Sequence, residues 1–238
     1  EDLLYKYSAG EKVKILIVPG HDDQFHGTEF SGPFGRFREA DLTREAAREL
    51  AERFRRDPAF EVVVTRGEAG YHPPLESYFV RERTAIEAFR RTFRGVMNSA
   101  VDAGLVAISP GVGHGEALET VAFKLYAITK WANEQAFDIV LHLHFNDYAG
   151  RKARTPGTYS GFSIYVPERQ FSNAQASRAL AKPVFERLKR YMPVSNLPKE
   201  SIGIIDDQEL IATGSNNTLD VAALLIEYGY IYESRFVH

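Results

Sequence analysis

Short apolar runs and longer amphipathic stretches alternate along most of the chain. Apolar runs of strand length lie at residues 12–18, 60–66, 138–146, 161–167 and 222–231. Several of these runs are apolar on both faces, which is typical of the central strands of a parallel sheet.

Helix-like stretches separate these runs. In residues 39–56 the apolar positions Leu42, Ala46, Leu50 and Phe54 are four apart, which places them on one face of a helix. Further helical patterns cover residues 76–97, 116–137 and 173–192, whereas residues 21–38 contain three glycines and a proline and are predicted to form a loop. The alternation predicts an α/β fold, a three-layer sandwich with a mainly parallel twisted sheet and helices on both faces.

Composition narrows the classes of function. The net charge of -3 gives no reason to expect a nucleic-acid partner, and without cysteines any metal must be bound by His, Asp or Glu. No run reaches the roughly 18 apolar residues of a membrane span, and the first residues are charged, without the apolar core of a signal peptide. We find no internal repeat or linker, and expect one domain over residues 1–238.

Chemically capable side chains gather where predicted strands end. His21 follows the first strand, His144 and Asn146 end the "DIVLHLHFN" strand, and Glu227 lies near the end of the last strand. Glu39 opens the helix after the first loop, where a carboxylate suits the electropositive helix end. Ligands gather at the carboxyl ends of parallel strands, so these side chains are candidates for one site.

These residues match those of a metal hydrolase. Two histidines and one glutamate can bind a metal ion, and the second glutamate can act as a general base. Each also has a structural interpretation. His21 could stabilise a turn, Glu39 could be solvated, and Glu227 could form a structural ion pair. His142 and His144 share one face of a strand and could both be core histidines. No short motif with fixed metal-ligand spacing is present, so pattern alone leaves these alternatives open.

Five motifs in order give the chain a resemblance to a known family. The segments "IVPGHDD", "GRFREADLTREAARELA", "VVVTR", "LHLHFND" and "LIEYGYI" are similar to those of the zinc-dependent N-acetylmuramoyl-L-alanine amidases, which cut peptidoglycan. The resemblance covers most of the chain and implies the same sandwich fold. The implied reaction is hydrolysis of the amide between N-acetylmuramic acid and L-alanine.

The resemblance also implies a role for each matching residue. One zinc ion per chain is expected on His21, Glu39 and His144, with Glu227 as the catalytic glutamate. His142 lies two residues before His144 on the predicted strand, and so farther from the carboxyl edge of the sheet. We therefore expect an orienting or packing role for it. Asn146 is expected to support the site or contact substrate.

The chain departs from the family pattern at two places. Asp22 and Asp23 replace two glycines that usually follow the first histidine, and we expect them to support His21 or to be solvated. Residues 71–120, here called the 71–120 segment, are expected to form a helical insertion. This insertion could be a packed elaboration or a lid over the groove, with His114 and Glu116 as conceivable plugs.

The sequence is also compatible with two rival functions. One rival is another zinc hydrolase of related fold, a carboxypeptidase or an amidohydrolase. A carboxypeptidase would need a cationic clamp for the free carboxylate, which Arg66, Arg81, Arg83 or Arg151 could supply. A non-catalytic wall-binding regulatory domain is the other rival, although all four chemical residues are present. A peptidoglycan substrate implies the cell envelope, periplasmic or extracellular, and an activator protein is a further partner to consider.

Overall fold

The computed structural model describes residues 2–109, 111 and 117–237. The helices are α1 (Asp2–Ser8), α2 (Glu39–Phe54), α3 (Pro73–Arg81), α4 (Arg83–Asp102), α5 (Glu119–Glu134) and α6 (Ala174–Leu188). The strands are β1 (Val13–Pro19), β2 (Glu29–Gly32), β3 (Gly35–Arg38), β4 (Phe60–Val64), β5 (Arg66–Gly67), β6 (Gly70–Tyr71), β7 (Ile139–Asn146), β8 (Ser163–Pro167), β9 (Ile204–Asp207) and β10 (Ala222–Tyr230). Two short 3-10 helices, Ile211–Thr213 and Ser215–Asn217, lie between β9 and β10.

Six strands form the central sheet, in the order β4-β1-β7-β10-β8-β9. The first four run parallel, β8 pairs antiparallel with β10, and β9 runs parallel to β8. The prediction of a mainly parallel sheet is therefore confirmed. Because β1, β7 and β10 are adjacent and parallel, their carboxyl ends lie at the same edge of the sheet.

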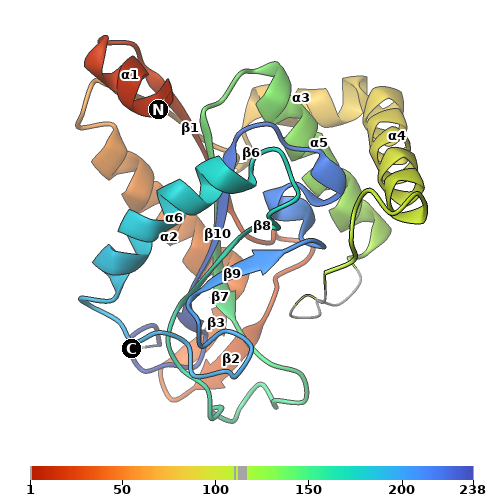
Figure 1. The fold of residues 1–238 in the computed structure, drawn as a ribbon. Coiled ribbons are helices and arrows are strands. Elements are labelled where there is room, and N and C mark those ends of the chain that lie inside the picture. Colours follow the sequence, from red (N-terminus) through yellow and green to blue (C-terminus); the bar gives the residue numbers. More distant parts are fainter. Residues whose placement is uncertain (1, 110, 112–116, 238) are drawn as a thin grey trace.

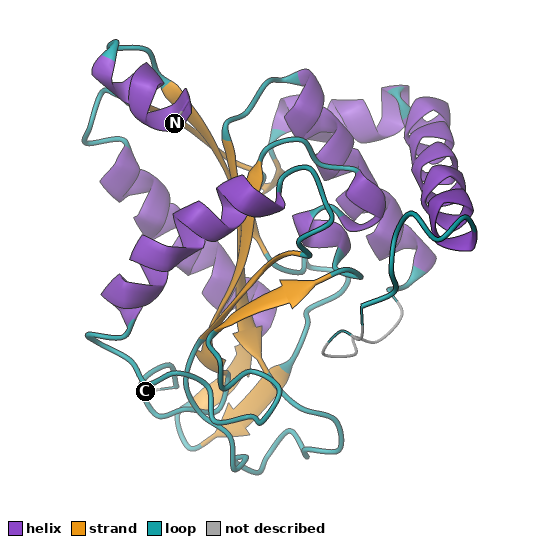
Figure 2. Ribbon diagram, viewed as in Figure 1, coloured by secondary structure: helices purple, strands orange, loops and turns teal. Residues whose placement is uncertain are grey.

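Helices cover both faces of this sheet, as the sequence predicts. Figure 1 shows α2 and α6 on one side of the strands and α3, α4 and α5 on the other. In Figure 2 the strands form a layer between two helical layers. Each helical layer has its own apolar core, because both faces of β1 and β7 are buried.

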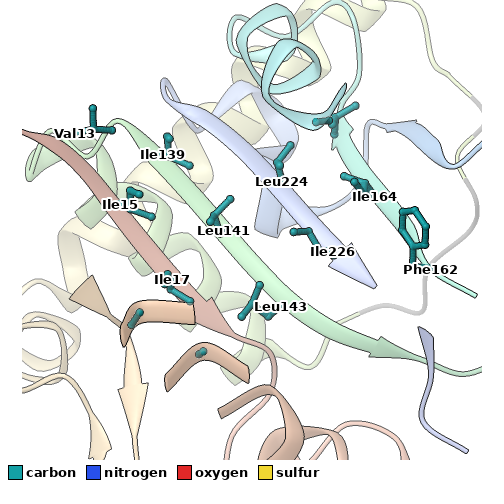
Figure 3. Close-up of a cluster of buried hydrophobic side chains, with 14 residues drawn as sticks. Val13, Ile15, Ile17, Ile139, Leu141, Leu143, Phe162, Ile164, Leu224 and Ile226 are labelled. Carbon is teal, nitrogen blue, oxygen red and sulfur yellow. The ribbon is translucent and has the colours of Figure 1, made fainter. Parts of the chain in front are cut away.

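The core under α2 and α6 consists of aliphatic side chains from neighbouring strands. Ile15, Leu141 and Leu224 project from β1, β7 and β10 toward the same layer (Figure 3). Ala47 of α2 and Ala181 of α6 are fully buried against them, and such small residues let helices approach the sheet closely. Fully burying a side chain such as Ile15 stabilises a fold by about 1.5–3 kcal/mol.

The prediction of a continuous loop over residues 21–38 was wrong in its second half. β2 and β3 form an antiparallel hairpin there, and Phe30 of β2 is buried in a separate aromatic cluster. Gly32, Pro33 and Gly35 belong to the tight turn between the two strands, whereas Gly27 precedes β2. This hairpin leads directly into α2 and so determines where Glu39 lies.

The 71–120 segment contains α3 and α4, and its last residues open α5. Its pattern predicts one helix over residues 76–97, but the structure has a break at Glu82, whose backbone leaves helical geometry. Leu75 of α3 and Ile86 of α4 enter the same apolar core, so the hydrophobic period does not reveal the break. In the described part of the chain, no helix is long and apolar enough to cross a bilayer.

Candidate active site

His21, Glu39 and His144 converge at the carboxyl edge of the sheet. Oε2 of Glu39 lies 3.1 Å from Nε2 of His21, and its Oε1 lies 2.9 Å from Nδ1 of His144. One potential ligand atom from each residue lies within 4.8 Å of the others. Side-chain exposure falls from 31% at His21 to 17% at His144 and 5% at Glu39, so the group opens toward solvent on the His21 side.

Glu39 is held by the backbone as well as by the histidines. It is the first residue of α2, as predicted, and its carboxylate accepts hydrogen bonds from the backbone N–H groups of Thr28 and Phe145. Burial alone would raise the pKa of Glu39, but His21 and His144 outweigh it and lower that pKa. The carboxylate is therefore charged and fixed between the two imidazoles.

His21 lies just past β1 in a strained backbone conformation. Its φ of 61° is in the left-handed region, which is uncommon outside glycine and often marks functional positions. Burial alone would lower the pKa of His21, but Glu39 and Asp22 outweigh it and raise that pKa. A metal ion bound at Nε2 of His21 would replace the ring proton and would interact with Glu39 in its place.

Arg66 holds the backbone around both of these residues. Its guanidinium donates to the carbonyl oxygens of His21 at 3.1 Å, Gly20 at 3.4 Å and Ala40 at 2.9 Å. Thr43 of α2 adds a hydrogen bond of 2.8 Å to the same Gly20 carbonyl. The segment after β1 is thus tied to the start of α2 by buried polar contacts.

Gly27 packs directly against the converging side chains. A Cβ on Gly27 would lie 2.4 Å from Oε2 of Glu39 and 2.5 Å from Cδ2 of His21, and its φ is +72°. Gly20 is similarly restricted, because a Cβ there would lie 2.4 Å from Cε1 of His144. Neither glycine is marked by the spacing of residues in the sequence.

We expect Gly27→Ala to weaken metal binding by roughly 10- to 100-fold, the range for changes that disturb the support of metal ligands. The added methyl group would push Glu39 and His21 apart. Gly10→Ala is a matched control, because Gly10 has φ +73° but no atom within 4 Å of an added Cβ. Competitive chelator titration measures both affinities, and equal affinities for the two variants would contradict the prediction.

Glu227 lies on β10 beside His144 of β7, in direct strand register. Its Oε2 atom is buried and has no hydrogen-bond partner. Burial first, and then the charges of Glu39 and Glu200, raise the pKa of Glu227 well above its usual range. A carboxyl group whose pKa is raised by burial is suited to general acid–base chemistry.

His142 lies one step deeper on β7, and the structure does not bring it into the three-residue group. It is 2% exposed, and its Nδ1 has no partner. Burial, and then the nearby His144, lower the pKa of His142 to about 3, so its ring is neutral. No hydrogen bond among the described residues joins it to Glu39, His21 or His144.

Asn146 connects the site to a buried carboxylate that spacing did not reveal. Its amide donates a 2.8 Å hydrogen bond to Glu200, which is 2% exposed. Glu200 also accepts hydrogen bonds from Tyr165 and Ser195, both at 2.6 Å. Asn146 is thus tied to Glu200 at the end of β7.

The two aspartates after His21 differ from each other. Asp22 is 6% exposed and accepts hydrogen bonds from Lys124 at 2.5 Å and from Tyr71 at 3.0 Å. Lys124 belongs to α5, so Asp22 ties the His21 loop to the helical layer beside it. Asp23 is exposed and lies 3.8 Å from Arg44, which agrees with the solvated alternative.

Two of the four arginines considered as a carboxylate clamp are already engaged. Arg66 is buried among backbone carbonyls, and Arg151 forms a two-point ion pair with Asp147. Arg81 and Arg83 are largely exposed on α3 and α4. The other suggested residues of the 71–120 segment, His114 and Glu116, lie outside the described residues.

The chemistry of His21, Glu39 and His144 fits a metal ion. Two imidazoles and a carboxylate are a standard ligand set for catalytic zinc, and ligand atoms around a tetrahedral ion at about 2.0–2.1 Å lie roughly 3.3 Å apart. The contacts of 3.1 and 2.9 Å are close to this spacing. Gly20 and Gly27 supply the room that a larger side chain would fill.

Residues 15–235 match the family model described as N-acetylmuramoyl-L-alanine amidase. The chain belongs to this amidase family. The resemblance inferred from its five motifs is therefore confirmed, whereas the identity of the metal remains a prediction. Among curated proteins, no sequence match is found.

Solved amidase structures share the fold at low sequence identity. An N-acetylmuramoyl-L-alanine amidase from Clostridium difficile 630 is 18% identical, with a TM-score of 0.54 over 92% of this chain and 81% of that one. The catalytic domain of CwlV from Bacillus (Paenibacillus) polymyxa var. colistinus is 15% identical, with a TM-score of 0.54 over 94% and 83%. The CwlD amidase from Clostridioides difficile, solved with the GerS lipoprotein, is 14% identical, with a TM-score of 0.54 over 92% and 83%.

Proposed function

We propose that this member of the amidase family is a single-domain, zinc-dependent enzyme that hydrolyses the amide between N-acetylmuramic acid and L-alanine in peptidoglycan. The proposal rests mainly on one observation: a potential metal-binding group and a carboxyl group that can take up a proton lie at the same edge of the sheet. The charged Glu39 lies between two imidazoles, and the protonatable Glu227 lies on the adjacent strand. Family membership supplies the substrate.

Each residue has a distinct role in this reaction. His21, Glu39 and His144 would hold the zinc ion, which when bound polarises a carbonyl group and makes water more acidic. Glu227 accepts the proton of the attacking water and returns it to the departing amine. Glu200 fixes the end of β7 through its hydrogen bond from Asn146. Arg66 fixes the backbone of His21 through its hydrogen bond to the carbonyl oxygen.

Product analysis distinguishes this reaction from that of a peptidase. We expect muropeptides to yield stem peptides with a free amino-terminal L-alanine, together with peptide-free glycan, by mass spectrometry. Loss of one carboxyl-terminal residue would instead support a carboxypeptidase. Binding without any product would support a wall-binding regulatory domain.

Metal content provides a separate test. We expect one zinc ion per chain by elemental analysis, because the described residues offer one group of ligands. A chelator should remove the zinc and abolish turnover together, and added zinc should restore both. Full activity in metal-free protein would contradict the proposed chemistry.

We expect the enzyme in the cell envelope, periplasmic or extracellular, because its proposed substrate lies there. An activator protein is part of the proposal, supported by the complex of CwlD with the GerS lipoprotein. Cell fractionation followed by immunodetection tests the first expectation. Affinity capture from envelope extracts tests the second.

A further inference from the structure

A cavity of about 890 Å³ opens beside His21 and His144 on the face of the sheet that α4 and α5 cover. This volume lies within the range of roughly 300–1,000 Å³ that is usual for ligand pockets. Its walls come from α4, α5 and the connection between β9 and β10, and strand residues form its floor. A substrate whose amide lay at His21 and His144 would extend into this cavity.

His142 contributes to the cavity floor. Its side chain is almost fully buried, and its Nδ1 has no hydrogen-bond partner. Buried polar atoms are nearly always paired in folded proteins, so an unpaired one calls for an explanation. A ligand with amide groups would supply the missing partner.

The charges that line the cavity are mostly paired with one another. The six charged side chains besides the histidines are Asp22, Arg90, Arg94, Glu119, Lys124 and Glu209. Lys124 pairs with Asp22 at 2.5 Å, and Arg90 forms a two-point ion pair with Glu119.

Arg94 and Glu209 remain available for a ligand. Both side chains are exposed, and within residues 2–109, 111 and 117–237 neither forms a hydrogen bond or an ion pair, although the charge of Arg94 also acts on Glu119. Arg94 belongs to α4 and Glu209 to the connection between β9 and β10, so the two charges come from different walls. A ligand that carries both a carboxylate and an ammonium group matches this arrangement.

We infer that the cavity is a subsite for the stem peptide, a short zwitterionic peptide, and that α4 of the 71–120 segment determines which stems are accepted. This inference rests on the proposed function. Arg94 binds the free carboxylate of the second stem residue, Glu209 binds the side-chain ammonium of a diamino acid in the third, and His142 binds a peptide group. A glycan strand of hydroxyl and acetamido groups fits less well, because it offers no opposite charge to either side chain.

The test compares substrates that differ by one charge. A muramoyl peptide with D-glutamate in second position is paired with its amidated D-isoglutamine form. For Arg94→Ala we expect kcat/KM on the acidic stem to fall roughly 10- to 100-fold through KM, the scale of a lost hydrogen bond to a charged group. The amidated stem should lose less than threefold.

Matched variants complete the design. Arg91→Ala removes an exposed arginine from the same helix outside the cavity and should leave both substrates unaffected. Glu209→Gln should raise KM for a tripeptide stem ending in a diamino acid, but not for a dipeptide stem. Equal losses on acidic and amidated stems, or no loss on either, would overturn the inference.

Binding to the free stem tripeptide separates the two proposals. Calorimetry should show weaker binding to Arg94→Ala than to the wild-type protein, at unchanged thermal stability. If the wild-type protein cleaves no muramoyl peptide but still binds the tripeptide through Arg94, the proposed function fails and the subsite stands. If it cleaves both stems and Arg94→Ala binds the tripeptide like wild type, the subsite fails and the function stands.

Discussion

Glu227→Gln is expected to bind zinc as tightly as the wild-type protein and to lose turnover by at least about 100-fold, the lower end for general acid–base catalysis. Glu227 lies beside His144 in the sheet but outside the three-residue group, so the substitution should spare the ligands. The amide keeps the shape of the side chain but cannot accept and return a proton. Steady-state hydrolysis of purified peptidoglycan, with zinc measured on the same samples, checks both halves of the prediction.

The raised pKa of Glu227 makes the substitution structurally mild. In the metal-free protein, burial and the charges of Glu39 and Glu200 favour the neutral carboxyl group, so a neutral amide should fold in its place. The positive charge of a bound metal ion would favour the carboxylate form, which is the form that accepts a proton. Glu61→Gln, on the exposed side of β4, is the control for loss of a carboxylate elsewhere. A fully active Glu227→Gln variant would show that another group moves the proton.

His144→Ala is expected to abolish zinc binding and turnover together. The change removes one of three ligand side chains and leaves Glu39 with only His21 as an imidazole partner. Elemental analysis after dialysis at micromolar protein, together with the hydrolysis assay, measures the effect. Thermal unfolding without metal shows whether the variant is folded.

His142→Ala is the matched comparison on the same strand, two residues away. Its imidazole makes no hydrogen bond to the ligand residues within the described part of the chain, so we expect weakened but measurable zinc binding. The opposite outcome, with zinc kept by His144→Ala and lost by His142→Ala, would shift the ligand assignment by two residues. It would also remove the match of β7 to the family motif.

The sequence predicted those parts of the site that follow from strand ends and helix starts. His21, His144 and Glu227 could be placed together because parallel strands carry their carboxyl ends to one edge, whatever the chain length between them. Glu39 could be added because it opens the next helix. The layers of the fold followed from the same alternation of patterns.

Contacts between distant segments could not be predicted in this way. Lys124 meets Asp22 across 102 positions, and Glu200 meets Asn146 across 54, with no spacing that marks either pair. Gly27 resembled an ordinary loop glycine, because its importance depends on side chains that approach it only in the folded chain. Arg66 was considered as a substrate clamp, because a sequence does not show that its guanidinium would be buried.

The buried guanidinium of Arg66 affects the entropy that the protein would lose on binding a metal ion. It holds three carbonyl oxygens around the segments that bear His21 and Glu39, so these side chains start from a narrow range of positions. Little conformational entropy would then be lost when an ion arrives, which favours tight binding through preorganisation. Metal uptake would resemble the filling of an assembled site rather than the folding of a loop around an ion.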